Sequence, residues 1–268
     1  MTQLPETKAI ELELDNGWLT IAFNTPENRN ALSSQLTSEL IETLNVVRDD
    51  RSVRGITLRG RGGVFCAGGD LKGFKSGFHG GEASHADVAA ANRAGGEMFV
   101  LINSMPQVVL ILVDGAAIAG GLGMVCCGDV VAVTKGAKFS LTETQLGIAP
   151  AQIAPYVARR LGVAMARRLM LTAQRFTGAE AKDYGLADFV AEDEAGFDAF
   201  EADIRKNVMR CAPGANAITK EILLAMPVLP PEEMMDFAAD GFARCMMSDE
   251  GREGIASFVE KRKPSWAE

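Results

Sequence analysis

Residues 108–123 read Val-Val-Leu-Ile-Leu-Val-Asp-Gly-Ala-Ala-Ile-Ala-Gly-Gly-Leu-Gly, and they decide the fold class. The first six are all apolar, which predicts a strand buried on both faces. The glycines that follow predict a tight turn, and then a helix beginning at Gly120. A membrane span needs about twenty uninterrupted apolar residues, and Asp114 and the glycines break this run. The stretch therefore predicts a soluble α/β protein.

The same order of strand and glycine-rich turn occurs upstream. Residues 54–58 predict a buried strand, and Phe65-Cys66-Ala67-Gly68-Gly69-Asp70-Leu71 follows as a second glycine-rich turn. Asn16-Gly17 predicts a hairpin between residues 10–14 and 19–23, and Ser33 or Ser34 is expected to cap the next helix. The other predicted elements are helices over 89–103, 153–161, 163–172, 178–184, 195–211, 216–225, 231–248 and 250–261, with short strands over 130–133, 138–140 and 187–190.

This order predicts an α/β core followed by an all-helical extension. The 268 residues suit one large domain, which we divide into a core over 1–194 and a C-terminal helical region over 195–268. The helical region is too small to bury a hydrophobic core by itself. We therefore expect it to pack on the core or on a neighbouring subunit.

Charge and residue counts exclude several classes of function. The chain has 27 basic and 35 acidic residues and a net charge of −8, which argues against a nucleic-acid partner. His79 and His85 are its only histidines, and both fall in a polar stretch predicted to be a loop, so a His-rich metal centre is excluded. The five cysteines contain no CxxC pair and, without a signal peptide, predict a cytoplasmic protein with reduced thiols.

The chemistry suggested by the two glycine-rich turns is carbonyl activation. Small residues let a ligand approach the backbone, and a pair of free N–H groups can hold the oxyanion that develops from a carbonyl. Neither turn fits the Gly-x-x-x-x-Gly-Lys phosphate loop or the dinucleotide fingerprint. Taken alone, each glycine-rich segment is most simply explained as a structural turn that binds no ligand.

Glu143 is the third chemical feature, because it is the only carboxylate between residues 130 and 159. Its spacing from Ser140 matches a capping box at a helix start. Its apolar neighbours favour the other interpretation, a buried acid–base group whose pKa is raised by desolvation.

Together these features resemble the crotonase (enoyl-CoA hydratase/isomerase) superfamily. The segment Asn24-Thr25-Pro26-Glu27-Asn28-Arg29-Asn30-Ala31-Leu32 looks like that family's loop beside CoA, and the ending Phe258-Val259-Glu260-Lys261-Arg262 is similar too. The resemblance implies a spiral of ββα units with a C-terminal helical trimerisation region, in a homotrimer or hexamer. It also implies an acyl-CoA substrate, with no separate cofactor, metal or membrane partner.

The resemblance carries over site residues by position. It implies that the N–H groups of Gly69 and Gly120 bind the thioester oxygen and that Glu143 is catalytic. The CoA-thioester contacts that it implies are Arg29, Ala31, Ala67, Asp70, Leu71, Phe258 and Lys261. For Asp70, helix N-capping is an alternative role. The loop over 73–84 is either a lid or a plain surface loop.

One departure from the family leaves the reaction open. Two-carboxylate hydratases carry a second Glu where this chain has Gly123, and some isomerases carry an Asp where it has Ala151. A single Glu143 can serve a hydratase or a Δ3,Δ2-enoyl-CoA isomerase, and a non-catalytic acyl-CoA binder is the alternative of another class. The run over 142–155 looks most like the glutaconyl-type hydratases, such as isohexenylglutaconyl-CoA and methylglutaconyl-CoA hydratase.

Overall fold

The hairpin that opens the chain forms around Asn16-Gly17, where both residues have positive φ (47° and 75°) and so suit a tight hairpin turn. It joins β1 (Ile10–Asp15) to β2 (Trp18–Phe23). The computed structural model describes residues 3–70 and 83–267. Within these residues the main sheet has six strands in the order β1-β2-β3-β4-β6-β9, and every pair after the hairpin is parallel. The remaining strands are β3 (Gly55–Gly60), β4 (Val108–Val113), β6 (Val130–Thr134) and β9 (Phe189–Ala191).

A second, smaller sheet lies at the end of β4, and the sequence did not predict it as a sheet. Its described strands run β5-β7-β8, with β5 (Ala116–Ile118) inserted between the predicted turn and the helix. The other two are β7 (Lys138–Ser140) and β8 (Phe176–Thr177). This sheet exists because β7 pairs with β5 and β8 pairs with β7, and local periodicity cannot reveal pairing between segments that are distant in the chain.

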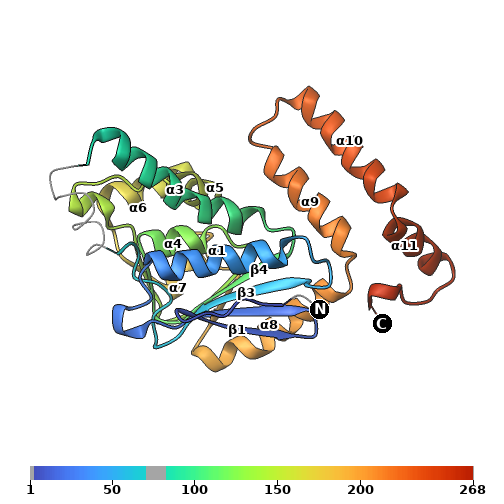
Figure 1. Cartoon of the computed structure of the whole chain (residues 1–268), viewed down its shortest axis with the longest axis horizontal. Coiled ribbons are helices and arrows are strands. Elements are labelled where there is room, and N and C mark those ends of the chain that lie inside the picture. Colours follow the sequence, from blue (N-terminus) through green and yellow to red (C-terminus); the bar gives the residue numbers. More distant parts are fainter. Residues whose placement is uncertain (1–2, 71–82, 268) are drawn as a thin grey trace.

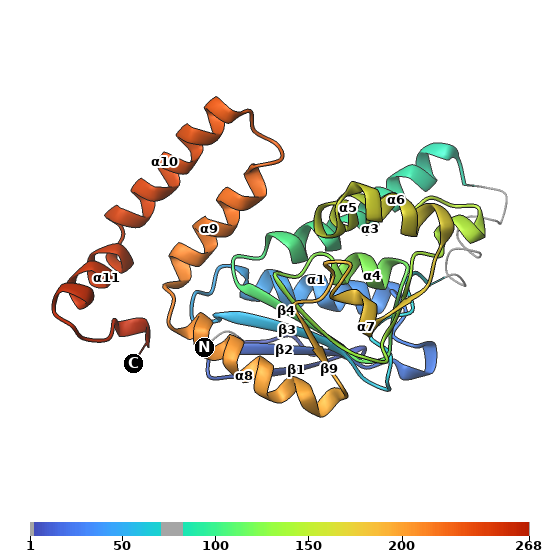
Figure 2. The same ribbon diagram turned by 180° about the vertical axis from the view of Figure 1, so that it is seen from behind.

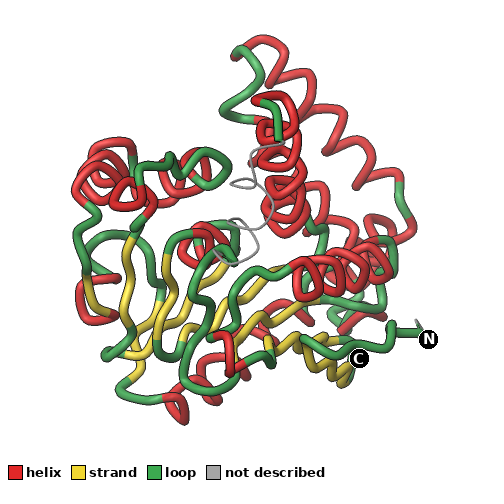
Figure 3. Tube along the Cα trace, turned by 60° about the vertical axis from the view of Figure 1, so that its left-hand side comes forward, coloured by secondary structure: helices red, strands yellow, loops and turns green. Residues whose placement is uncertain are grey.

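Helices cover both faces of the main sheet (Figures 1 and 2). On one face lie α1 (Ser34–Arg48), α3 (His85–Ser104), α4 (Gly120–Val125), α5 (Ala154–Leu161) and α6 (Val163–Thr172). On the other face lies α8 (Phe197–Met209). The remaining described helix of the body is the short α7 (Gly178–Ala181), which follows β8. Figure 3 shows the strands gathered into a layer below most of the helices.

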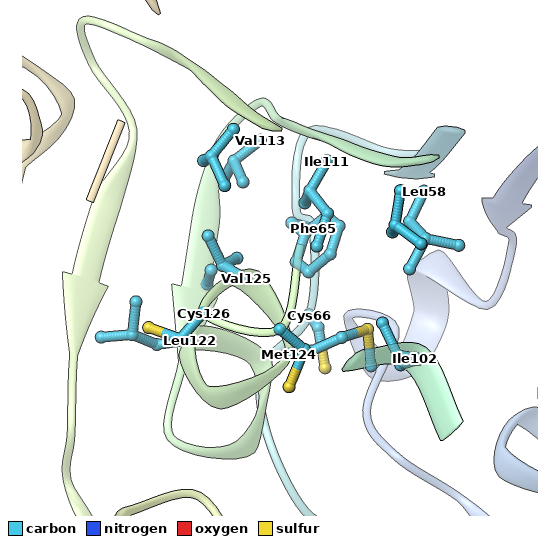
Figure 4. Packing of buried hydrophobic residues seen from close by; sticks show 14 of the residues in the cluster. Leu58, Phe65, Cys66, Ile102, Ile111, Val113, Leu122, Met124, Val125 and Cys126 are labelled. Carbon is cyan, nitrogen blue, oxygen red and sulfur yellow. The ribbon is translucent and has the colours of Figure 1, made fainter. Parts of the chain in front are cut away.

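The core forms where α4 meets the sheet. Figure 4 shows Val125 from α4 near Phe65 and Ile111, and these three side chains and Leu122 of the same helix are fully buried. Cys126, at the end of α4, is also buried, and burial raises the pKa of its thiol to about 12. It is therefore the inert core residue that its apolar context predicts.

The C-terminal helices form an arm that stands apart from this layered body (Figures 1 and 2). It consists of α9 (Pro213–Ala225), α10 (Pro231–Met247) and α11 (Asp249–Val259). Lys220 fastens α9 to the body through an ion pair with Asp129 and a hydrogen bond from its Nζ to the Gln107 carbonyl oxygen at 2.6 Å. By contrast α8, which falls in the region predicted over 195–268, packs on the sheet through Phe197 and Val208. The division at residue 194 stays a prediction.

Several local predictions need correction. His85 lies in the first turn of α3 and not in a loop, because Ser84 and Asp87 form a capping box there. The helix predicted over 178–184 ends at Ala181, since the chain turns at Gly185, which has φ 77°. The possible lid over 73–84 lies almost wholly outside the described residues. No helix in the described ranges is long and apolar enough to cross a membrane.

Candidate active site

The two glycine-rich turns predicted from the sequence lie against each other. Cys66 bridges to β5, since its N–H donates to the Ala116 carbonyl (3.0 Å) and its carbonyl accepts from the Ile118 N–H (3.0 Å). Gly68 sits at φ 92°, and a methyl group there would lie 2.9 Å from Cβ of Ala119 and 3.6 Å from the amide nitrogen of Gly120. The approach of these two turns therefore requires glycine at position 68.

The N–H groups of Gly69 and Gly120 are available to a ligand. Among the described residues neither group has a hydrogen-bond acceptor. Ala119, which precedes Gly120 and caps α4, has φ 52° and ψ −121°, a strained conformation for a residue with a Cβ. Strain of this kind is concentrated at functional sites, where the surrounding structure enforces it. The arrangement suits a pair of donors aimed at one carbonyl oxygen.

The loop over 24–32 is held beside the first turn by Asn30, which is fully buried. Its Oδ1 accepts from the Thr25 N–H (2.8 Å), and its Nδ2 donates to the carbonyls of Arg61 (3.0 Å) and Val64 (2.7 Å). Two more backbone bonds join the segments, from Ala67 N–H to the Arg29 carbonyl (3.1 Å) and from Leu32 N–H to the Gly68 carbonyl (2.8 Å). The structure thus brings Arg29, Ala31, Ala67 and Asp70 together.

The small sheet joins the segment of Glu143 to the second glycine-rich turn. Strand β7 pairs with β5, and the Ala119 N–H donates to the Ser140 carbonyl at 2.8 Å. Glu143 then begins the 3₁₀ helix η2 (Glu143–Leu146). The predicted capping box does not form, because Ser140 ends a strand and its hydroxyl donates to the Ala173 carbonyl at 3.0 Å.

The environment of the Glu143 carboxyl favours the acid–base interpretation. Its Oε2 atom is buried and has no hydrogen-bond partner among the described residues. Burial raises the pKa of this carboxyl, against a smaller opposing effect of its own backbone N–H. A buried, unpartnered polar atom is uncommon in native proteins and asks for a functional explanation.

Gly123, the departure from the two-carboxylate pattern, has a structural reason. A methyl group at Gly123 would lie 2.3 Å from Cγ2 and 2.5 Å from Cβ of Ile153, which is itself buried. Ile153 precedes α5, and Gly123 lies one turn of α4 beyond Gly120, on the same face. An aliphatic side chain therefore occupies the space that a second carboxylate would need.

Three other predicted CoA-thioester contacts are not placed at this site by the structure of the single chain. Phe258 and Lys261 are exposed; Phe258 belongs to α11 and Lys261 follows it, and α11 lies away from α4 (Figure 1). Leu71 lies outside the described residues. The prediction that Phe258 and Lys261 touch CoA therefore requires the arm of another subunit.

Sequence reasoning missed residues that the fold places around Gly120. Phe99 of α3 is one, since its Cζ would lie 3.8 Å from a methyl group at Gly120. Tyr156 of α5 packs on Phe99 with ring centroids 6.2 Å apart, and Gln152 and Ile153 precede it. The Gly95-Gly96 pair inside a predicted helix was the one available signal, because glycine is unfavourable there.

The fold and the site together define a class of protein: an α/β protein with two backbone N–H groups suited to a carbonyl oxygen and a half-buried carboxyl in the segment after β7. Comparison with known proteins agrees with this class. The family model of enoyl-CoA hydratase/isomerase matches residues 13–268. The human "Enoyl-CoA hydratase domain-containing protein 2, mitochondrial" is 32% identical over 257 residues, which are 94% of this chain and 86% of that protein.

Two solved structures are similar over nearly their whole length. Pseudomonas aeruginosa AtuE has 43% sequence identity and a TM-score of 0.92, with 97% of this chain and 100% of that chain covered. An enoyl-CoA hydratase/isomerase from Marinobacter aquaeolei has 38% identity, also with a TM-score of 0.92, over 97% and 99% of the two chains. The chain belongs to the enoyl-CoA hydratase/isomerase (crotonase) family, and it is an enzyme of that family.

Proposed function

We propose that this enzyme adds water to the double bond of a 2-enoyl-CoA thioester, with Glu143 as the single acid–base group. The observation that carries the proposal is the buried Oε2 atom of Glu143, which has no hydrogen-bond partner among the described residues. Its segment follows β7, which is joined to the second turn by the bond from the Ala119 N–H to the Ser140 carbonyl, and the N–H groups of Gly69 and Gly120 have no acceptor among the same residues. The thioester carbonyl oxygen would accept a hydrogen bond from each of these two N–H groups. Bound there, it would direct the β-carbon of the acyl chain toward the carboxylate.

The addition needs one group that first takes and then returns a proton. As the oxygen of water bonds to the β-carbon, one of its protons passes to Glu143. The alkene electron pair shifts into a double bond between the α-carbon and the carbonyl carbon, and the carbonyl π pair moves onto the thioester oxygen. The two backbone N–H groups stabilise this enolate oxygen. Glu143 then delivers the proton to the α-carbon, and the carbonyl forms again. A raised pKa suits a carboxyl that must hold the proton between the two steps.

A Δ3,Δ2-enoyl-CoA isomerase is the second candidate, and Ile153 is the observation that favours it. Isomerisation only moves a proton between two carbons, so it needs no second carboxylate to hold a water molecule. The apolar contact of Ile153 with Gly123 removes the place where that second carboxylate would stand.

Turnover in heavy-oxygen water separates the candidates. A hydratase incorporates the label into a 3-hydroxyacyl product, an isomerase shifts the double bond without label, and a non-catalytic binder does neither. Glu143→Gln should lower turnover about 10²–10⁴-fold while thioester binding persists. Glu180→Gln is the matched control, because Glu180 forms a true capping box with Thr177 and Gln can serve that role. Near-normal turnover in Glu143→Gln would refute the acid–base role.

We also propose that three chains assemble through the arm. Large apolar side chains on it are open to solvent in the single chain, among them Phe258 (85% exposed), Met247 (78%) and Phe242 (66%). Exposed apolar surface on this scale is typical of an interface. A trimer would bring Lys261 of one chain toward the CoA phosphates of another. A monomer by light scattering at micromolar concentration would refute this assembly.

The acyl group and the compartment are further parts of the proposal. A branched glutaconyl-type acyl chain is supported by the resemblance of residues 142–155 to that subgroup. A reducing compartment such as the cytoplasm is supported by the five cysteines, which are all unpaired.

A further inference from the structure

Helix α3 contains two adjacent glycines, Gly95 and Gly96, which differ sharply in their surroundings. Each costs a helix interior about 1 kcal/mol relative to alanine. A methyl group at Gly95 would meet nothing within 4 Å, whereas one at Gly96 would lie 2.3 Å from Oε1 of Gln152. Gly96 therefore admits the Gln152 side chain directly against the backbone of α3.

The Gln152 amide is also fixed at its other end. Its Nε2 donates to Oδ1 of Asn92 at 2.8 Å, so the two amides form a bridge from the start of α5 to α3. Asn92 is exposed and Gln152 half-buried, and the Nδ2 group of Asn92, with its two donors, has no acceptor within the described ranges 3–70 and 83–267. The bridge thus presents hydrogen-bond donors at a place that a ligand can reach.

The bridge lies on the seam between α3 and the segment that leads into α5, and the candidate site lies farther along the same seam. Phe99 is next to Gly120, and Gly96 and Asn92 follow on the same face of α3, about 4.5 Å and 10 Å farther along the helix axis at 1.5 Å per residue. On the facing side Ile153, which touches Gly123, is adjacent to Gln152. Going outward from the thioester position, the seam is first apolar (Phe99, Ile153) and then polar (Gln152, Asn92).

We propose that the Gln152–Asn92 amide bridge recognises a carboxylate carried on the acyl chain of the substrate, and so selects dicarboxylic enoyl-CoA thioesters. This inference rests on the proposed function. An acyl chain held at Gly120 would pass Phe99 and Ile153 before its far end reached the bridge. The carboxylate would accept from the Asn92 Nδ2 group, and the Gln152 amide would hold Asn92 in place.

The test compares glutaconyl-CoA, which carries the carboxylate, with crotonyl-CoA, which lacks it. The measured quantity is the ratio of kcat/KM for the two thioesters. Asn92→Leu and Gln152→Leu should lower this ratio about 10- to 100-fold, the range expected for a lost hydrogen bond to a charged group. Gly96→Ala should change the ratio in the same direction by displacing the Gln152 amide. Gly95→Ala, the matched control, should leave it unchanged.

Each outcome decides the inference. A ratio unchanged in all three site variants, or a wild-type enzyme without preference for glutaconyl-CoA, would overturn it. Equal losses with both thioesters, accompanied by a lower Tm, would show that the bridge only joins α3 to α5. If the wild-type enzyme turns over neither thioester, the proposed function fails. Calorimetric affinities of the same two thioesters for the same variants then decide the binding claim separately.

Discussion

The contact between Gly123 and Ile153 gives the sharpest test of the packing beside the oxyanion site. In Gly123→Ala the new methyl group would overlap Ile153, and overpacking of a core costs about 1–3 kcal/mol. Alanine also gains about 1 kcal/mol of helix propensity over glycine, so we expect a net loss of about 1 kcal/mol in the free energy of unfolding. Ile153→Ala alone should cost about 3 kcal/mol, within the range for a buried Ile.

The loss of unfolding free energy in the double variant should not equal the sum of these two losses. Once Ile153 is shortened, the methyl at Gly123 has room, and Gly123→Ala should then stabilise by about 1 kcal/mol through helix propensity. The coupling energy between the two positions is therefore about 2 kcal/mol. Gly95→Ala, which meets nothing within 4 Å, should stabilise by about 1 kcal/mol in either background.

Urea unfolding at one fixed protein concentration measures these differences, because assembly makes apparent stability depend on concentration. Equal m values across the four variants are needed for the comparison. Additive losses in the double variant, within about 0.5 kcal/mol, would refute the contact and with it the explanation given for Gly123.

The site and the arm give four further predictions. Burial raises the pKa of Glu143, so the folded protein disfavours its ionised form; Glu143→Gln should raise the urea midpoint at neutral pH, and the gain should vanish below the ordinary pKa of 4.5. For the same reason the acidic limb of kcat/KM should lie above pH 4.5. Lys220→Met removes the ion-pair partner of Asp129, which is exposed and still accepts from the Val109 N–H, and should cost about 1 kcal/mol of unfolding free energy by the same assay. Lys261→Ala should weaken CoA affinity by roughly 1 kcal/mol in calorimetry, and the difference should shrink in high salt.

The sequence by itself determined the layered α/β core. A short unbroken apolar run followed by glycines is typical of a strand buried on both faces, and residues 108–113 were predicted with the bounds that β4 has. Local rules also placed the hairpin at Asn16-Gly17 and narrowed the helix cap to Ser33 or Ser34. The structure shows that Ser33 is the cap, since its hydroxyl accepts from the Leu36 N–H. The two glycine-rich turns could be found because their backbone conformation depends on local residues.

Only the tertiary structure decided which of these parts act together. The spacing of Ser140 and Glu143 fits a helix cap as well as a catalytic carboxyl, and pairing of β7 with β5 removed the cap by placing Ser140 in a strand. Ile153 lies thirty residues beyond Gly123 in the sequence, and no local pattern states that it fills the space there. Local sequence sets backbone conformation, but the chemistry of a site depends on side chains that only long-range packing brings together.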